Sequence, residues 1–325
     1  MNVLVLGANG PVGQRLCQLL HGSGRVTVVA AAPDGDPARG QVRLDPQNAG
    51  AVREAVRGMQ AVVQCPDAGG AALVESTRHL VRAAVAEGCG RLVQVGSQAA
   101  YGEVEGVVDE RARTGRRGGA WRAAEDLLVA CGRRGGTSVL LRTGCLWGPR
   151  AGTWAERLAR WLHAGRLGDL GAAGDGWSNL VHVDDVCVAV LRALQLPLQP
   201  GESRTYNLAG ADSPRWNEVL IDLALATGAT PVRRMRPLAL RLQAWTDPLA
   251  ATLLRAPPAP PASEPLTPAL LALWRSQLRL DPRAAMKDLV LDWTPYPVAL
   301  QEIASWWRGR QEESELEPLA VPQGS

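Results

Sequence analysis

Short apolar runs alternate with helical patterns through the first half of this chain. The apolar runs fall at residues 3–6, 26–30, 61–63, 91–95 and 137–141. Apolar residues recur at helical spacing over residues 51–57, 71–87 and 123–133. Alternation of this kind is typical of a parallel sheet that is covered by helices on both faces. The sequence therefore predicts an α/β fold with a doubly wound parallel sheet of the Rossmann type.

The first apolar run leads directly into a bend with three glycines. The bend reads Gly7-Ala8-Asn9-Gly10-Pro11-Val12-Gly13, and a helical pattern follows it. Glycine permits a positive-φ turn after the strand, a close approach of the backbone to a ligand, and close packing of the helix on the sheet. The N–H groups at the helix start face an anion. We expect a dinucleotide pyrophosphate to bind Gly7, Asn9, Gly10, Pro11, Val12 and Gly13.

After residue 149 the pattern becomes mostly helical. Helical spacing covers residues 153–164, 216–227, 238–254, 269–277 and 298–307, and short strands are expected at 180–183 and 205–208. We expect a dinucleotide-binding domain made of residues 1–151 and 179–211. Residues 152–178 and 212–310 are expected to form a smaller, mostly helical substrate-binding cap. Residues 311–325 are acidic and contain proline, which predicts a flexible tail.

Composition narrows the classes of partner. The chain has 325 residues, of which 46% are hydrophobic and 21% charged, and its formal net charge is +3. This charge is too small for a surface that follows nucleic-acid phosphates. No uncharged run is long enough to span a bilayer, and the chain starts on a strand without a signal segment, so we expect a cytoplasmic protein without a membrane partner. The six cysteines are scattered without metal-ligand spacing, and no metal site is expected.

Four further motifs join the glycine bend in one order along the chain. Asp45 follows the third apolar segment, and the others are Gly96-Ser97-Gln98-Ala99-Ala100-Tyr101-Gly102, residues 141–149 (LRTGCLWGP) and residues 181–186 (VHVDDV). With them, the sequence resembles the extended short-chain dehydrogenase/reductases, the nicotinamide-dependent epimerase, dehydratase and reductase group. The end of the chain, at residues 266–267, 293–295 and 306–307, resembles the branch that contains 3β-hydroxysteroid dehydrogenases.

This resemblance implies roles for several residues. Asp45 would lie beside the adenine of the cofactor. Cys65, Gly96 and Cys145 would line the cofactor site, and Ser97 would hold the reacting oxygen of the substrate. Ser97 follows a buried strand, where its hydroxyl can donate to an oxygen that becomes alkoxide-like during hydride transfer. The alternative is that Ser97 only caps the end of its strand.

The family's catalytic Tyr and Lys have no counterpart in this sequence. Alignment on Ala124 and Glu125 puts Arg117 at the Tyr position and Trp121 at the Lys position. Arginine stays charged and cannot exchange a proton, and indole does not titrate. A shift by one residue puts Gly118 at the Tyr position, so no shift restores the pair.

Tyr101 is the nearest phenol and a candidate proton donor. One of Arg113, Arg116, Arg117 or Arg122 could assist it, because a nearby cation favours the phenolate. The catalytic candidates are therefore Ser97, Tyr101 and Arg117. The alternative is that Tyr101 is a packed aromatic residue and that these arginines are solvated.

Cofactor preference depends on the end of the second strand. NAD-preferring relatives carry an acidic residue there, whereas this chain has Ala30, Ala31 and Ala32. The missing acid favours NADP over NAD, with Arg39 as a distant candidate for the extra phosphate, although Asp34 and Asp36 weaken that assignment. His182 lies at a strand-to-helix junction and is expected to be structural, with an Asp capping the helix.

The leading hypothesis is an NAD(P)-dependent oxidoreductase acting on a hydroxyl or carbonyl group of a small or lipid-like metabolite, with a non-standard proton donor. The first alternative is a catalytically inactive cofactor-binding protein, either a sensor or a partner of an active enzyme. The second is non-redox chemistry in the same cleft. By analogy with relatives, the helices at 71–87 and 123–133 would form a homodimer.

Overall fold

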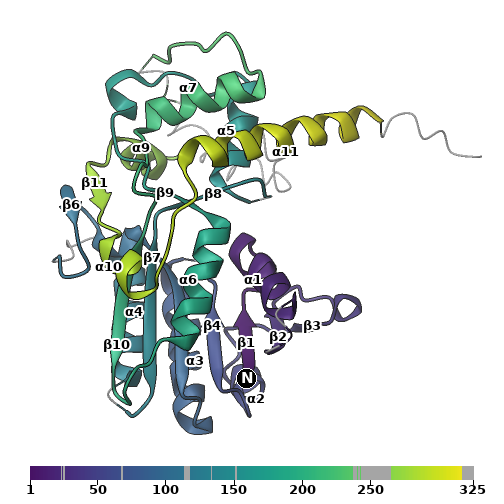
Figure 1. Ribbon diagram of the computed structural model, residues 1–325, viewed down its shortest axis with the longest axis vertical. Helices are drawn as coiled ribbons and strands as arrows, with labels where there is room; N and C mark the ends of the chain where they lie inside the picture. Colours follow the sequence, from purple (N-terminus) through teal and green to yellow (C-terminus); the bar gives the residue numbers. More distant parts are fainter. Residues whose placement is uncertain are drawn as a thin grey trace, which may run out of the picture. The chain divides into compact units, whose positions relative to one another are not determined.

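The structure is a computed structural model that describes residues 1–22, 24, 26–66, 69–112, 118–132, 134–150, 152–236, 240, 242 and 265–316. Its main sheet contains β1 (Asn2–Leu6), β2 (Thr27–Ala32), β3 (Gln41–Arg43), β4 (Ala61–Gln64), β5 (Arg91–Ser97), β7 (Thr137–Thr143) and β10 (Ser203–Leu208). Within the described residues these strands run in the order β10-β7-β5-β4-β1-β2-β3, and every neighbouring pair is parallel (Figure 1). The predicted parallel α/β sheet is confirmed.

Helices cover both faces of this sheet. One layer consists of α2 (Ala49–Val56), α3 (Gly70–Glu87) and α4 (Gly119–Gly132), with α3 packed against the other two. Leu4, Val62 and Leu92 point from the strands into the apolar core beneath this layer. The other layer contains α1 (Pro11–Gly22) and α6 (Val183–Gln195), which pack against each other. The sheet is therefore doubly wound, as the alternating pattern predicts.

Local signals set the ends of these helices. The Asn48 side chain accepts hydrogen bonds from the N–H groups of Gly50 and Ala51 at the start of α2. Gly88 ends α3 with a φ of 70°, a left-handed conformation that glycine adopts without steric cost. Short 3₁₀ helices lie at η1 (Pro37–Arg39), η2 (Gln98–Tyr101) and η3 (Gly171–Gly174).

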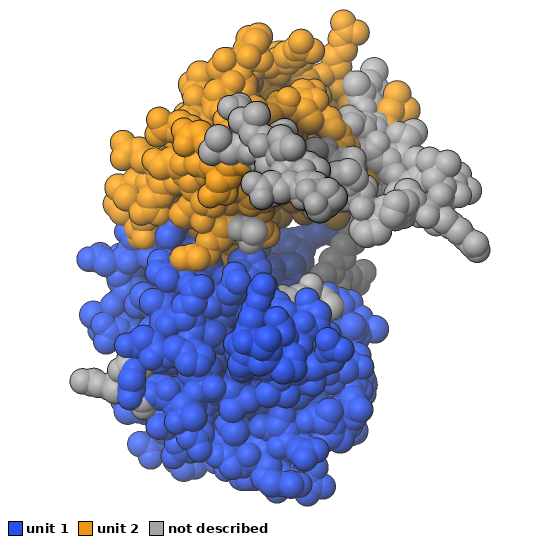
Figure 2. Space-filling view, turned by 90° about the vertical axis from the view of Figure 1, so that its right-hand side faces the viewer, with its two compact units in different colours: residues 1–144, 181–211, 278–293 blue, residues 145–180, 212–277, 294–325 orange. Residues whose placement is uncertain are grey.

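The chain divides into two compact units (Figure 2). Unit 1 comprises Met1–Gly144, Val181–Ala211 and Leu278–Trp293, and unit 2 comprises Cys145–Leu180, Asp212–Gln277 and Thr294–Ser325. The segment Leu278–Trp293 was assigned to the cap from the sequence, but it lies in unit 1. There β11 (Leu278–Leu280) pairs with β6 (Gly106–Val108), and α10 (Arg283–Asp288) packs on β10. This pairing joins segments far apart in the sequence, so a local pattern does not reveal it.

Unit 2 has a core rich in tryptophan. Its helices are α5 (Trp154–His163), α7 (Trp216–Thr227), α9 (Pro268–Arg275) and α11 (Tyr296–Leu316). The short strand β8 (Cys145–Trp147) begins its first segment, which ends at Leu180, the first residue of β9 (Leu180–His182). The indoles of Trp147, Trp161, Trp216 and Trp274 are almost completely buried. A tryptophan buries a large apolar area, and these rings therefore supply much of the packing in a chain without phenylalanine.

The last third of the chain differs from the sequence-based expectation in its tail. The helix expected at 238–254 falls almost entirely outside the described residues. The flexible tail was expected to begin at residue 311, but α11 continues to Leu316, and residues beyond 316 lie outside the description. No helix in the described part of the chain is long and apolar enough to cross a membrane.

Candidate functional site

The glycine bend between β1 and α1 is closed by backbone hydrogen bonds. Gly7 has a φ of 82°, and the N–H groups of Gly7 and Ala8 both donate to the carbonyl oxygen of Ala31, at 2.9 and 3.1 Å. The N–H of Gly10 donates to the carbonyl oxygen of Gly7 at 3.3 Å. Positive φ is strained for any residue with a Cβ. The predicted turn at Gly7 is therefore present and is anchored to the end of β2.

Gly13 makes the closest approach in the bend. A Cβ atom at Gly13 would lie 2.0 Å from the carbonyl oxygen of Gly7, and the neighbouring atoms are also backbone. Pro11 has no N–H, and the N–H of Gln14 donates to Gly10 at 2.9 Å. The N–H groups of Val12 and Gly13 precede that bond and have no acceptor inside the helix. The start of α1 therefore offers two backbone donors and the positive end of a helix dipole, which suits an anion.

A cavity of about 100 Å³ opens beside this bend, entirely within unit 1. It is lined by residues at or just after the ends of β1, β2, β3 and β4, together with two residues of α3: Leu6, Gly7, Ala31, Ala32, Pro33, Leu44, Pro46, Gln47, Gln64, Cys65, Pro66, Ala72 and Ser76. The structure thus brings Gly7 and Cys65 to one cavity. Its walls are mostly apolar, as expected for a site that takes a flat ring.

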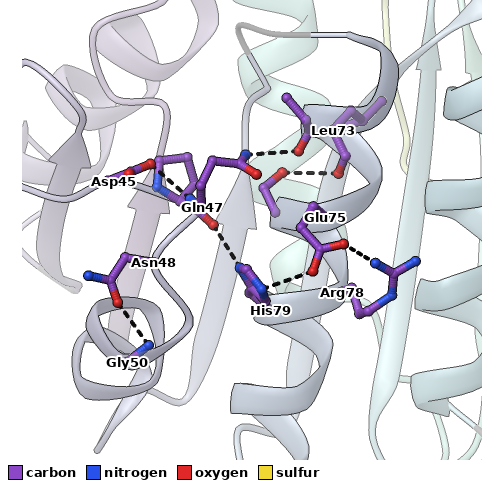
Figure 3. Close-up of polar contacts among 11 residues, drawn as sticks. Asp45, Gln47, Asn48, Gly50, Leu73, Glu75, Arg78 and His79 are labelled. Carbon is purple, nitrogen blue, oxygen red and sulfur yellow. Dashed lines mark hydrogen bonds and ion pairs between the residues drawn. The ribbon is translucent and has the colours of Figure 1, made fainter.

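Asp45 does not line this cavity directly. Its exposed carboxylate accepts the N–H of Gln47 at 2.9 Å, and its carbonyl oxygen accepts the N–H of Asn48 at 3.0 Å (Figure 3). The neighbours Pro46 and Gln47 form the wall instead. Asp45 therefore shapes the turn that borders the cavity.

Asp34, which weakens the assignment of Arg39 to an NADP phosphate, lies close to the glycine bend. The Asp34 carboxylate accepts a hydrogen bond from Asn9 Nδ2 at 2.7 Å. Asp34 stands 21 residues after Gly13, near the spacing of the acid that binds a ribose in NAD-binding folds. Arg39, the candidate for an extra phosphate, is exposed and lies 3.5 Å from Asp36. The spacing from Gly13 is the feature of the sequence that singles out Asp34.

Ser97 ends β5 and begins η2. Its Oγ accepts the N–H of Ala99 at 3.1 Å, and its side chain is partly exposed. A hydroxyl that accepts one hydrogen bond can still donate its own hydrogen. Gly96 precedes it, and its carbonyl oxygen accepts the Thr143 hydroxyl at 2.8 Å, which ties the ends of β5 and β7 together. The strand-capping role expected as the alternative is present and leaves the Ser97 hydrogen available.

Tyr101 is completely buried. Its hydroxyl donates toward Asn207 Oδ1 at 2.7 Å and the Asp109 carbonyl oxygen at 2.9 Å. The Arg142 guanidinium carbon lies 4.5 Å from the ring centroid. Burial raises the pKa of Tyr101, and the charge of Arg142 only partly offsets this effect. The arrangement favours the structural alternative, because the hydroxyl already has protein partners and no exposure.

A buried ion pair fixes Arg142. Its Nε and Nη2 donate to the two carboxylate oxygens of Glu125 at 2.9 and 2.8 Å, and both side chains are at most 5% exposed. Burial alone would lower the pKa of Arg142, but the hydrogen bonds and charge of Glu125 outweigh it and the net shift is upward. Two-point pairing holds α4 against β7, and loss of one partner would leave a buried charge.

The segment around the start of α4 contains the positions that the sequence alignment compares with the family's Tyr and Lys. Arg117 lies outside the described residues, as do Arg113 and Arg116. A Cβ at Gly118 would lie 2.4 Å from the Ala100 carbonyl oxygen, so this position admits no side chain without a backbone shift. Trp121 is partly buried in the first turn, and Arg122 pairs with Asp126 at 2.9 Å.

Two other residues take structural positions. Cys145 belongs to unit 2, where it is buried and its N–H donates to the Asn179 carbonyl oxygen at 3.0 Å. His182 precedes α6, and its Nδ1 accepts the N–H of Asp184 at 3.3 Å. The expected aspartate cap is wrong in detail, because His182 is the cap and the Asp184 carboxylate instead binds Arg15 at 2.8 Å.

Unit 2 contains a cavity of about 490 Å³ with two arginines in its lining. Arg234 and Arg275 border it together with apolar or small residues: Leu170, Gly171, Ala172, Ala173 and Met235. A Cβ at Gly171 would lie 3.0 Å from Arg234 Nη2, so the glycine leaves space for the guanidinium. Both arginines are exposed, and in the described part of the chain neither has a carboxylate partner. The sequence pattern does not reveal this pair, because Arg234 and Arg275 are 41 positions apart and border one cavity only in the folded chain.

Comparison with known proteins places this geometry in a family. A family model described as "NAD dependent epimerase/dehydratase family" matches residues 3–209, which include the glycine bend, Ser97 and the ion pair between Arg142 and Glu125. The chain belongs to the NAD-dependent epimerase/dehydratase family. The resemblance to this family is therefore confirmed, and residues 3–209 lie within unit 1 apart from Cys145–Leu180.

A curated protein and several solved structures are similar to this chain over most of its length. A 2-alkyl-3-oxoalkanoate reductase from Stenotrophomonas maltophilia (strain K279a) is 30% identical over 261 residues, which cover 71% of this chain and 77% of the reductase. The solved structure of MoeE5 in complex with UDP-glucuronic acid and NAD has a TM-score of 0.71 at 22% identity, covering 95% of this chain and 100% of MoeE5. A UDP-glucose 4-epimerase from Thermotoga maritima, solved with UDP-glucose, has a TM-score of 0.73 at 16% identity, covering 96% and 100%. At these identities the two structures show the fold.

Proposed function

We propose that this chain binds NAD in the glycine bend and the adjoining cavity of unit 1. The supporting observation is the cradle at Gly13, which a single Cβ would close, together with the N–H groups of Val12 and Gly13 that have no acceptor in the helix. The pyrophosphate would take these donors, and the adenosine would lie among Ala32, Pro46 and Cys65. The residues present in the bend and the cavity fit NAD.

We infer a preference for NAD over NADP, in place of the preference for NADP expected from the sequence. The Asp34 carboxylate beside Asn9 can accept a hydrogen bond from a ribose 2′-hydroxyl. A 2′-phosphate at the same place would meet a negative charge instead of a cation. Arg39 does not compensate, because it pairs with Asp36 and is exposed.

The proposed activity is oxidoreduction at a carbonyl or hydroxyl carbon of a small or lipid-like metabolite. The nicotinamide, when bound, supplies or accepts the hydride. The Ala99 N–H orients the Ser97 hydroxyl, whose hydrogen can then donate to the substrate oxygen. Arg117 is retained as a proposed cation near that oxygen, although it lies outside the described residues. Since arginine exchanges no proton, water is the proposed proton source.

The substrate is proposed to carry an anionic group. Arg234 and Arg275 border the unit 2 cavity, neither has a carboxylate partner among the described residues, and the remaining lining is apolar or small. A carboxylate or phosphate on an alkyl or sugar skeleton matches such a lining. The related reductase is named for an oxoalkanoate and the related epimerase was solved with UDP-glucose. An oxoalkanoate and UDP-glucose are both anions.

A second candidate is a cofactor-binding protein without turnover. Three observations favour it: no side chain fits at Gly118, Trp121 cannot titrate, and the Tyr101 hydroxyl is held in the core. Loss of a general acid/base costs about 10² to 10⁴ in rate, which leaves slow chemistry as the expected outcome for the first candidate.

We also propose a homodimer through α3 and α4, whose packed pair exposes Val85, Ala86, Ala123 and Ala130.

One experiment separates the two candidates. Purified protein is mixed with NAD or NADH, and its melting temperature and the absorbance of the reduced cofactor are followed with alcohols, 3-oxo acids and nucleotide sugars. The leading proposal predicts stabilisation together with slow turnover of an anionic substrate, and a rise in KM of about tenfold when Arg234 and Arg275 are both changed to Gln. Stabilisation without turnover selects the binder, and absence of stabilisation overturns both.

A further inference from the structure

A small polar cluster on α3 holds the turn that forms one wall of the unit 1 cavity. The turn comprises residues 44–48, between β3 and α2. Within these five residues only Leu44 is fully buried, so the turn has few apolar contacts of its own. Figure 3 shows the His79 ring of α3 pointing at this turn. His79 is only 9% exposed.

Two side chains connect the turn to α3. His79 Nδ1 lies 3.3 Å from the Pro46 carbonyl oxygen, and its Nε2 lies 3.0 Å from Glu75 Oε1, one helical turn earlier. Gln47 Nε2 donates to the Ala72 carbonyl oxygen at 3.0 Å. We call the contacts of His79, Glu75 and Gln47 the α3 clasp. Both groups that face the His79 ring are acceptors, and in either tautomer the imidazole N–H can donate to one of them.

The orientation of the ring is itself supported. Glu75 pairs with Arg78 through its second carboxylate oxygen as well as with His79, and this double pairing holds the carboxylate in place. The clasp ends at Pro46 and Gln47 on one side and at Ala72 on the other, and all three residues line the cavity. The distance between two walls of the cavity is therefore set by Gln47, which lines it, and by His79 and Glu75, which do not.

We propose that His79 is a positioning residue for nucleotide binding, holding the 44–48 turn against α3 so that the adenosine half of the ligand meets a preformed wall. This inference rests on the proposed binding of NAD in unit 1. A preformed wall avoids the ordering cost that a loose turn would add on binding. His79 itself touches no ligand in this scheme. Only ligands that carry adenosine should depend on it.

The test compares two halves of the ligand. ADP and nicotinamide mononucleotide are titrated separately, by calorimetry, into the full chain and into His79→Leu, His79→Gln and the control His21→Leu. His21 bonds only the Cys17 carbonyl oxygen of its own helix among the contacts described. His79→Leu should weaken ADP about fivefold to tenfold, the size of one or two lost hydrogen bonds, and leave the mononucleotide within about twofold. His79→Gln, whose amide can donate to Pro46, should restore most of the ADP affinity.

Each other outcome is decisive. Equal ADP affinity in His79→Leu and the unmodified chain overturns the positioning role while leaving NAD binding intact, and equal weakening of both halves assigns His79 to general stability. Failure of the unmodified chain to bind ADP overturns the proposed function itself. A second measurement without ligand is hydrogen exchange: the amides of Gln47 and Asn48 should exchange faster in His79→Leu, with α4 amides unchanged. Unchanged exchange at the turn contradicts the clasp.

Discussion

Gly13 shows how a single position constrains ligand chemistry. A Cβ atom at this position would lie only 2.0 Å from the carbonyl oxygen of Gly7. The missing side chain therefore allows α1 to begin close to the bend. Helix geometry leaves the first N–H groups of α1 without an acceptor inside the helix, so that they can bind an anion. Gly22 belongs to the same helix, but a Cβ there would meet nothing within 4 Å. Two glycines in one helix therefore differ completely in what they permit.

Tyr101 yields a prediction at the scale of one residue. Tyr101→Phe should lower the free energy of unfolding by about 1 kcal/mol, because Asn207 loses a donor in the core. Any turnover should stay within about twofold, because the buried hydroxyl takes no part in proton transfer. Chemical denaturation and steady-state rates measure the two effects.

The matched control is Tyr206→Phe, which removes a hydroxyl donor to Asp288 in the same unit. It should change stability to a similar extent without touching the Tyr101 network. A fall in rate of 10²-fold or more in Tyr101→Phe alone would restore the phenol as the proton donor.

At the scale of elements, α3 carries two separate tasks. The face around His79 holds the 44–48 turn, and another face packs on α4. On the surface of this pair, Val85 is 41% exposed and lies among small residues such as Ala86. A surface of small and apolar residues on two neighbouring helices can pack closely against a second copy related by twofold symmetry.

The proposed dimer gives a measurable mass. Sedimentation should report about 69 kDa, twice the 34.6 kDa of one chain. Val85→Asp, which places a charge on the proposed interface, should shift the protein to 34.6 kDa without unfolding it. The control is Val107→Asp, since Val107 is 66% exposed on β6 instead of α3. A monomer for the unmodified chain at high micromolar concentration would contradict the proposal.

Across the whole molecule, local patterns predicted more of unit 1 than of the site. The alternation of apolar runs and helices suffices for a parallel sheet, because each strand and its helix are close in sequence. The pairing of β6 with β11 spans about 170 residues, and nothing local marks it. Sequence therefore placed Leu278–Trp293 in the wrong unit.

The candidate site was predictable only where the backbone sets it. The glycines at 7 and 13 have conformational requirements that spacing alone reveals. Contacts between side chains are different, because they depend on tertiary distances. The bond between Asp34 and Asn9 and the arginine pair of the unit 2 cavity are of this kind. Burial of Tyr101 is a third example, since its partner Asn207 comes from β10.

The central claim is that the bend from Gly7 to Gly13 holds the pyrophosphate of NAD. Calorimetric titration of the unmodified chain, Gly13→Ala and Gly22→Ala with NAD tests it most directly, with NADP as a second ligand. We expect one NAD site per chain and an affinity for NADP that is about tenfold lower because of Asp34. Gly13→Ala should weaken NAD binding at least about tenfold, and Gly22→Ala should leave it unchanged. Equal NAD affinity in Gly13→Ala and the unmodified chain, or no heat at millimolar NAD, would contradict it.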